Sequence, residues 1–358
     1  MDKQASLNMI AAISDAYGAP GFEDEVLQVI RRFGADLGDF HEDTMRNLYL
    51  ERRENRGTGL RVQLDAHTDE VGFMVQAIRP NGTLRFVPLG GWTPANIPAH
   101  RVRVQTADGT YIPGVVASKP PHFMSESERK QAPAIEDMSI DIGSSSRAET
   151  MDVFHVRMGA PVVPDVNFSY EAEHDLMIGK AFDCRAGCAA LLKTLYDLQG
   201  ETLDVDVVGA CASQEEVGTR GAVVTANVIK PDIAIVFEGC PADDTVVEPY
   251  MVQTALKRGP MLRHIDREMI TNPHYQRYAL DLAEELGIPV QDSVRSGGAT
   301  NGASIHLSNE GVPVIVIGIP VRYIHTHYGF AAWSDFENAA KLACAILKRF
   351  DRDLIESF

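Results

Sequence analysis

The stretch LRVQLDAHTDE, residues 60–70, decides the fold class of this 358-residue chain. Its first seven residues read as a buried strand, and a polar run that begins at His67 follows directly. Strand-like runs of the same kind occur at residues 203–210, 233–237 and 312–319. Helical patterns occur at residues 187–198, 272–286 and 333–350. Strands that alternate with helices predict an α/β fold, with a mixed sheet covered by helices on both faces.

Between residues 71 and 165 the sequence changes character. Turn signals such as Pro80-Asn-Gly82, Leu89-Gly-Gly91 and Ala107-Asp-Gly109 separate short strand-like runs. Short strands at this spacing are typical of a small barrel or sandwich. We therefore expect one α/β domain built from residues 1–70 and 166–358, with a β-rich domain inserted at residues 71–165.

The composition narrows the partners that we expect. Lys and Arg number 33 against 50 Asp and Glu, which gives a formal net charge of −17. An acidic chain is poorly suited to the phosphates of nucleic acids or to an anionic membrane surface, and no apolar run reaches the roughly 18 residues that span a bilayer. The five cysteines include no CxxC pair, which favours reduced thiols and a cytoplasmic location. We predict neither a nucleic-acid partner nor a membrane partner.

Five groups of His, Asp or Glu stand at the ends of predicted strands or before a predicted helix. They are His67 with Asp69, Asp183, Glu215 with Glu216, Glu238, and His325 with His327. Ligands of open α/β sheets bind in the crevice beyond the carboxyl ends of the strands. Each group alone has an ordinary structural explanation, such as a core histidine, a solvated glutamate pair or a helix cap. Together they predict one polar crevice.

Imidazole and carboxylate groups in one crevice suit Zn²⁺, Co²⁺ or Mn²⁺. Two such ions about 3.5–4 Å apart need a bridging carboxylate. Hydrolysis also needs a carboxylate that is not a ligand and accepts a proton from water. The adjacent Glu215 and Glu216 point in different directions and can supply a base and a ligand. Asp69 lies on the same side of an extended segment as His67 and can orient its imidazole. The pattern therefore predicts a metal-dependent hydrolase.

The polar groups lie within five longer motifs. These are DAHTDEVG at 65–72, FDCRAG at 182–187, QEEVGTRGA at 214–222, FEGCPADDT at 237–245 and RYIHT at 322–326. In content and order they resemble the tetrahedral aminopeptidase family, metallopeptidase family forty-two, over nearly the whole chain. The resemblance implies a fold of the zinc-dependent exopeptidase type. It also implies a PDZ-like or barrel-like insertion at residues 71–165, for oligomerisation or substrate access, within the catalytic domain.

The resemblance assigns a role to seven of these residues. The implied metal ligands are His67 and Glu238 for a first divalent ion, Glu216 and His325 for a second, and Asp183 as a bridge between them. Glu215 would be the general base and Asp69 would orient His67, so these two are the implied catalytic residues. Members of the family form dodecameric tetrahedra. The implied protein is therefore a homo-oligomer that acts on short peptides with a free N-terminus.

Three positions depart from the family pattern. Cys184 stands where Asn is usual, and Glu238 stands where Asp is common. After His325 the chain reads Thr-His, where the family often has Ser followed soon by Glu, so His327 becomes a candidate substrate contact. Gly298, in the turn Ser296-Gly-Gly298, is a second candidate, because a glycine-rich loop can support a developing oxyanion, although such a loop can also be an ordinary turn.

We predict an aminopeptidase that removes N-terminal residues from short peptides with two divalent metal ions, Zn, Co or Mn, and a glutamate base. The same metal chemistry leaves a deacetylase or a carboxypeptidase open as alternatives. A glycan hydrolase is a remote third, because two Trp and 7% aromatic residues offer few groups on which a sugar could stack.

Overall fold

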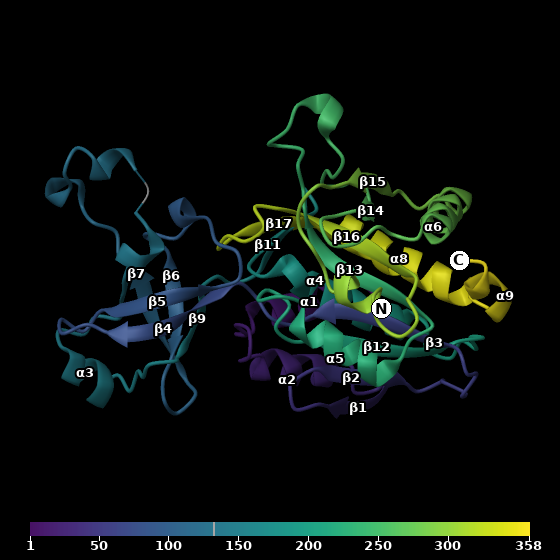
Figure 1. Ribbon diagram of the computed structural model, residues 1–358, viewed down its shortest axis with the longest axis horizontal. Coiled ribbons are helices and arrows are strands. Elements are labelled where there is room, and N and C mark those ends of the chain that lie inside the picture. The colour runs from purple at the N-terminus through teal and green to yellow at the C-terminus, as the bar shows by residue number, and fades with distance from the viewer. Residues whose placement is uncertain (132) are drawn as a thin grey trace.

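The computed structural model describes residues 1–131 and 133–358. The chain folds into an α/β body and a smaller β-rich part that projects from it (Figure 1). The body contains both ends of the chain, and the projecting part is built from a single central segment. This division explains why the sequence changes character twice along its length.

A large mixed sheet forms the centre of the body. Within the described residues its main path runs β1 (Gly38–Glu42), β2 (Leu48–Arg52), β12 (Asp206–Ala212), β3 (Arg61–His67), β13 (Ile233–Pro241), β16 (Val314–Arg322), β17 (Gly329–Ala332), β11 (Leu176–Gly179) and β10 (Ser169–Glu171). Two further strands, β14 (Met261–Ile265) and β15 (Gln291–Val294), attach through β16. The four central strands β12, β3, β13 and β16 are mutually parallel. Their carboxyl ends therefore lie at one edge.

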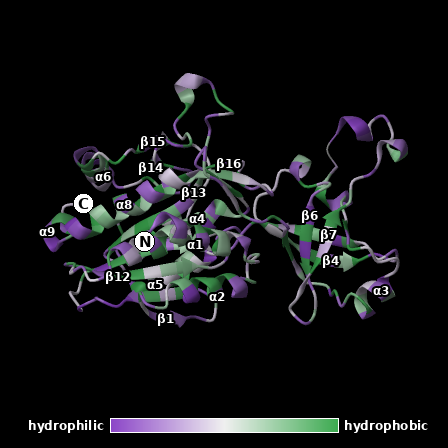
Figure 2. Ribbon diagram, turned by 180° about the vertical axis from the view of Figure 1, so that it is seen from behind, coloured by the Kyte–Doolittle hydropathy of each residue, from purple (hydrophilic) through white to green (hydrophobic). Residues whose placement is uncertain are grey.

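Helices cover both faces of this sheet, as the sequence predicts. One face contacts α4 (Phe182–Asp197) and α8 (Trp333–Arg349), with α1 (Lys3–Asp15) packed on α4. The other face contacts α5 (Arg220–Ile229) and α7 (Gly302–Ile305). Along β13 the side chains of Ile235 and Phe237 join the core under α4, whereas Val236 joins the core under α5. This alternation follows from the two-residue repeat of a strand, and the strands stand out as hydrophobic in Figure 2.

The remaining helices are α2 (Asp24–Phe33), α3 (Arg147–Asp152), α6 (Pro273–Leu286) and α9 (Arg352–Glu356). Helix α6 shows why the local sequence folds as it does. Asn272 caps it by accepting hydrogen bonds from the backbone N–H groups of His274 and Tyr275, with Pro273 at its first position. Gly287, at a φ of 65°, ends it. None of the described helices is both long and apolar enough to cross a membrane.

The projecting part is a closed barrel. Among the described residues its strand order is β4 (Gly72–Ile78), β5 (Leu84–Leu89), β8 (Ile140–Asp141), β7 (Tyr111–Val116), β6 (Arg101–Gln105) and β9 (Pro161–Pro164). Phe73, Phe86 and Val104 belong to its separate hydrophobic core. All six strands fall inside the segment expected for the insertion. The expected PDZ-like form is not confirmed, since the strands close into a barrel.

Several elements of the body were not predicted from the sequence, among them β1, β10, β11, β17 and α5. Strands β14 and β15 were not predicted, because MLRHI and QDSV are short and carry polar side chains. Asp183 precedes the regular part of α4, as the sequence predicts, although the bounds of α4 include it. It lies in the first turn of α4 with extended dihedral angles (φ −86°, ψ 106°). Strands β14 and β15 and the backbone at Asp183 all border the candidate site.

Candidate metal centre

The carboxyl edge of the sheet brings the predicted ligands together. His67 is the last residue of β3, and Glu238 lies within the neighbouring strand β13. Asp183 stands between two imidazoles: its Oδ1 atom is 3.1 Å from Nε2 of His67, and its Oδ2 atom is 3.2 Å from Nε2 of His325. Glu216 Oε2 lies 3.3 Å from the same nitrogen of His325. One carboxylate therefore faces both histidines.

The donor atoms form two groups that share Asp183. The first contains His67, Asp183, Cys184 and Glu238, and the second contains Asp183, Glu216 and His325. Within each group the donor atoms lie within 4.8 Å of one another. Glu216 Oε1 and Glu238 Oε2 are buried and accept no hydrogen bond among the described residues. Buried carboxylate oxygens without a partner are costly unless a cation satisfies them. The residues present therefore fit divalent metal ions that prefer nitrogen and oxygen ligands.

Asp183 reaches this position because the backbone before α4 passes close to the sheet. Gly239 makes the approach possible, since a Cβ atom there would lie 2.6 Å from the Cα atom of Asp183. Ala181 adopts a left-handed conformation (φ 55°), and Asp183 and Cys184 have non-helical dihedral angles. The irregular start of α4 thus turns the carboxylate toward both histidines rather than leaving it as a helix cap.

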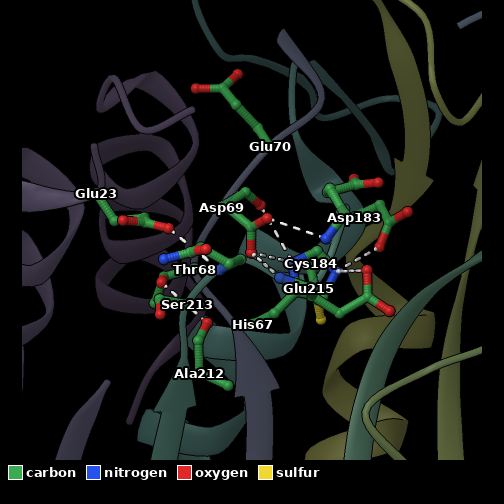
Figure 3. A network of polar contacts seen from close by, with 12 residues as sticks. Glu23, His67, Thr68, Asp69, Glu70, Asp183, Cys184, Ala212, Ser213 and Glu215 are labelled. Atoms are coloured by element: carbon green, nitrogen blue, oxygen red, sulfur yellow. Dashed lines mark hydrogen bonds and ion pairs between the residues drawn. The ribbon is translucent and has the colours of Figure 1, made fainter. Parts of the chain in front are cut away.

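Asp69 contacts both His67 and the backbone of the segment that carries Glu215 and Glu216. Its two carboxylate oxygens accept hydrogen bonds from the backbone N–H groups of Glu215 (2.9 Å) and Glu216 (3.0 Å). The Nδ1 atom of His67 lies 3.1 Å from the carbonyl oxygen of Asp69 and 3.3 Å from its Oδ1 atom. Figure 3 shows Asp69 between these segments. A single buried carboxylate thereby fixes the loop that carries two glutamates and the histidine at the end of β3.

Burial and charge set the protonation behaviour of the site. Burial raises the pKa of Glu215 to about 7, with the charge of His67 opposing the rise and that of Asp183 adding to it. Burial also raises the pKa of Glu216 and of Glu238 well above the ordinary value. The pKa of Asp183 is lowered, because hydrogen bonds from His325 and His67 outweigh its burial. Glu215 Oε2 is 3.9 Å from Nε2 of His67, so the base candidate borders the donor groups.

Cys184 and Glu238, the two departures from the family pattern among the donors, both lie in the first group. The thiol of Cys184 donates a hydrogen bond to the carbonyl oxygen of Phe237 (3.2 Å), and burial raises its pKa well above the usual range. Glu238 is 5% exposed. The longer side chain therefore still places a carboxylate in the donor group.

A cavity of about 650 Å³ opens beside the donors. Asp183, Glu215, Glu216, Glu238 and His325 line it, and so does the predicted contact Gly298. Trp92, Thr93 and Asn96 of the barrel part also line it. His327 does not belong to the lining. It is 1% exposed and stacks on His100 of the barrel part, with ring centroids 4.0 Å apart. The structure therefore does not place His327 where a substrate would contact it.

Two arginines in the cavity wall were missed by the sequence analysis. Arg263 lies on β14, and Arg295 follows β15 directly. Neither residue belongs to a recognisable motif, and neither strand was predicted. The only signal in the sequence was that Arg295 immediately precedes the turn Ser296-Gly-Gly298, which was already a candidate for substrate binding.

Comparison with known proteins places this site in a family. Residues 47–342 match the family model for M42 glutamyl aminopeptidase. The chain is 32% identical to the glutamyl aminopeptidase of Lactococcus lactis, with 97% of each chain covered. It is 31% identical to the lysyl aminopeptidase of Pyrococcus furiosus, covering 82% of this chain and 83% of that one.

Solved structures agree. A TET aminopeptidase from a marine sediment thaumarchaeon superposes with a TM-score of 0.93 at 36% identity, covering 98% of this chain and 99% of that one. The TET1 peptidase of Pyrococcus horikoshii, which can assemble into a tetrahedron or a large octahedral shell, gives a TM-score of 0.87 at 27% identity, covering 96% and 100%. The fold, the donor groups and these matches lead to one conclusion: the chain belongs to the M42 glutamyl aminopeptidase family.

Proposed function

We propose that this metal-dependent aminopeptidase hydrolyses the first peptide bond of short peptides, with two divalent cations held on either side of Asp183. The observation that carries the proposal is the position of Asp183, whose two oxygens face His67 and His325 separately. His67 and Glu238 would hold one cation, and Glu216 and His325 the other. Zn, Co and Mn all suit these donors.

Divalent cations bound here would polarise the scissile carbonyl and make the attacking water easier to deprotonate. Glu215 would accept the proton of that water and return it to the leaving amine. Its carboxylate lines the cavity and lies 3.9 Å from Nε2 of His67, which puts it within reach of a water at the donor groups. Asp69 would act as a positioning residue, because it holds the backbone of Glu215 and contacts His67 without lining the cavity.

The acidic side of the cavity supports the requirement for a free N-terminus. Asp183, Glu215, Glu216 and Glu238 all line it, so a substrate ammonium group would meet carboxylates there. Specific observations do not favour the alternative functions. The named relatives are aminopeptidases rather than carboxypeptidases or deacetylases. Among the described residues that line the cavity, Trp92 is the only Phe, Tyr or Trp, so a glycan hydrolase would have few rings on which to stack a sugar.

We also propose a homo-oligomer, with a tetrahedral dodecamer as its form. The loop between β13 and β14, which includes a short 3₁₀ helix at Pro249–Met251, protrudes from the body (Figure 1). Val246, Tyr250 and Met251 on this loop are exposed. Exposed apolar clusters commonly mark interaction surfaces, which supports a contact between copies.

A role of residues 71–165 in substrate access is supported by Trp92, Thr93 and Asn96 in the cavity wall.

The test is hydrolysis of matched short peptides with free and acetylated N-termini, followed by mass spectrometry. We expect stepwise loss of N-terminal residues from the free peptides and none from the acetylated ones. Removal of residues from the C-terminus, or release of the acetyl group, would overturn the proposal in favour of a carboxypeptidase or a deacetylase. Fractionation of the cells that produce the chain tests the predicted cytoplasmic location.

A further inference from the structure

A buried ionic cluster outside the donor groups includes residues on both sides of Asp183 in the chain. Its members are Glu70, Lys180 and Arg185, and their side chains are at most 1% exposed. Oε1 of Glu70 lies 2.6 Å from Nζ of Lys180 and 3.3 Å from Nη2 of Arg185. We call these three residues the buried clamp.

The buried clamp holds the chain before and after Asp183. Lys180 precedes the left-handed residue Ala181, which leads into Asp183, and Arg185 comes two residues after Asp183. Because both cations contact the same oxygen of Glu70, the two ends of this short segment are tied to one point. The backbone N–H of Arg185 also donates to the carbonyl oxygen of Ala181 (2.9 Å), which closes the turn around Asp183. The backbone that carries the shared carboxylate is therefore fixed from outside the donor groups.

Glu70 also connects this segment to the loop that carries the two adjacent glutamates. It directly follows Asp69, whose carboxylate accepts hydrogen bonds from the backbone N–H groups of Glu215 and Glu216. Figure 3 shows the side chain of Glu70 pointing away from that of Asp69. Two consecutive residues thus hold different parts of the centre: Asp69 holds the glutamate loop, and Glu70 holds the segment of Asp183.

The cations of the clamp are anchored at the end of α1. Arg185 donates through Nη1 to the carbonyl oxygens of Ile13 (2.8 Å) and Ala16 (2.9 Å), and through Nη2 to that of Gly18 (3.2 Å). Nζ of Lys180 donates to the carbonyl oxygen of Ala16 (3.0 Å). The clamp therefore joins the start of α4 to the last turn of α1 and the residues that follow it.

Stability alone does not explain a clamp of this kind. Taking ions out of water costs free energy, and a buried ion pair commonly adds no stability over apolar residues of the same volume. In addition, Oε2 of Glu70 and Nε of Arg185 are buried and have no hydrogen-bond partner among the described residues. Charge-assisted hydrogen bonds do fix geometry, because they are short and directional. The clamp is thus better suited to fixing the position of a segment than to stabilising the fold.

We propose that Glu70, Lys180 and Arg185 position the carboxylate of Asp183 so that each of its two oxygens faces one metal ion. They are positioning residues, since none of them belongs to either donor group. This inference rests on the proposed function, in which Asp183 is the ligand that the two cations share. A shift of the segment would move both oxygens of Asp183 together, so the clamp should control the affinity of both metal sites.

The experiment titrates the metal-free full chain with Co²⁺, followed by absorbance, in the wild type, in Glu70→Gln and in Lys180→Met. Each variant removes one charge of the clamp and keeps a side chain of similar shape. We expect the dissociation constants of both ions to rise about 10- to 100-fold, the range for groups that orient metal ligands.

Lys193→Met is the matched control. Lys193 lies toward the other end of α4, is only 2% exposed, and pairs with Asp197 (2.6 Å) and Glu337 (3.2 Å). Its variant also breaks a buried ion pair but should keep both dissociation constants at the wild-type values. Thermal unfolding of each metal-free variant, measured alongside, separates a general loss of stability from a loss of metal affinity. Unchanged affinity in both clamp variants, weakening at one site only, or equal weakening in Lys193→Met would overturn the inference.

Glu70→Asp decides the matter if the two clamp variants do not fold. It keeps the charge but shortens the side chain, so the carboxylate cannot keep both of its contacts to Lys180 and Arg185. Weaker binding of both ions would support the inference, and wild-type affinity at both sites would overturn it. Binding of fewer than two Co²⁺ ions by the wild type would instead contradict the proposed function itself.

Discussion

The two donor groups around Asp183 differ in how they are built. His67 is fully buried at the end of a central strand, and Glu238 lies on the neighbouring strand. His325 has a side chain that is 37% exposed and lies in the loop between β16 and β17, at a φ of 57°. Glu216 also lies on a loop, held through Asp69. One half of the centre is thus part of the sheet, and the other half is part of the surrounding loops.

Two glycines of the barrel part approach the second half closely. A Cβ atom at Gly91 would lie 3.1 Å from Nδ1 of His325, and one at Gly90 would lie 3.2 Å from Oε2 of Glu216. For the first half, the corresponding close approach is that of Gly239 to Asp183, within the body. The first half, which we call the buried half, therefore lies within the α/β fold. The second half also approaches the barrel, and we call it the exposed half because His325 is 37% exposed, although Glu216 is buried. Local opening is easier in loops than in core strands.

Metal removal should have the largest effect on activity, and it also tests the difference between the two halves of the centre. Dialysis against a chelator should abolish hydrolysis, and Zn²⁺ or Co²⁺ should restore it. Because loop-held ligands open more easily, we expect the metal content per chain to fall in two steps, with the exposed half emptied first. Metal analysis over the time of dialysis measures this. Loss of both ions in a single step would break the distinction between the halves, and activity unaffected by the chelator would contradict metal dependence.

Substitution of the base is the next largest test. Glu215→Gln should lower kcat by about 10²- to 10⁴-fold, the usual contribution of general acid–base catalysis. Metal content should stay at the wild-type value, since Glu215 belongs to neither donor group. Glu284→Gln, on the exposed side of α6, is the matched control and should keep full activity. An active Glu215→Gln enzyme would remove this residue from the mechanism.

Asp69 joins the two halves, and its substitution should have an intermediate effect. Asp69→Asn offers one acceptor oxygen where two backbone N–H groups now bind, so the loop of Glu215 and Glu216 loses one anchor. We expect activity to fall about 10- to 100-fold, as for residues that orient metal ligands. The metal in the exposed half should also bind more weakly, while His67 keeps its bond to the carbonyl oxygen of Asp69. Metal titration of both halves, with Asp281→Asn as a surface control, separates these effects.

A change at the contact between the barrel and His325 should have the smallest effect, a modest loss of metal affinity. In Gly91→Ala the new methyl group must displace His325 by a few tenths of an ångström. We expect a loss of about tenfold or less in affinity for the second ion, and none for the first. Equilibrium titration with Co²⁺, followed by absorbance, measures both sites. Equal weakening of the two sites would show that the barrel acts on the whole centre.

Much of the centre could be predicted from the sequence because its residues follow strong local patterns. His67, Glu215 and Glu238 come at or after apolar strands, and parallel strands bring their carboxyl ends to one edge. The two arginines could not be found in this way, because short polar strands have no clear periodicity. The burial of His327 could not be predicted either, because the ring on which it stacks, His100, belongs to the barrel.

The sequence by itself determined the fold class, the family and the chemical types of the donors, since these depend on periodicity and motif spacing. Only the tertiary structure decided which donors share Asp183, which half of the centre lies on loops, and that two arginines and four carboxylates line one cavity. The physical reason is that each of these properties depends on contacts between segments far apart in the chain. The irregular backbone at Asp183 and the packing of the barrel on the body fix those contacts, and no local pattern encodes either of them.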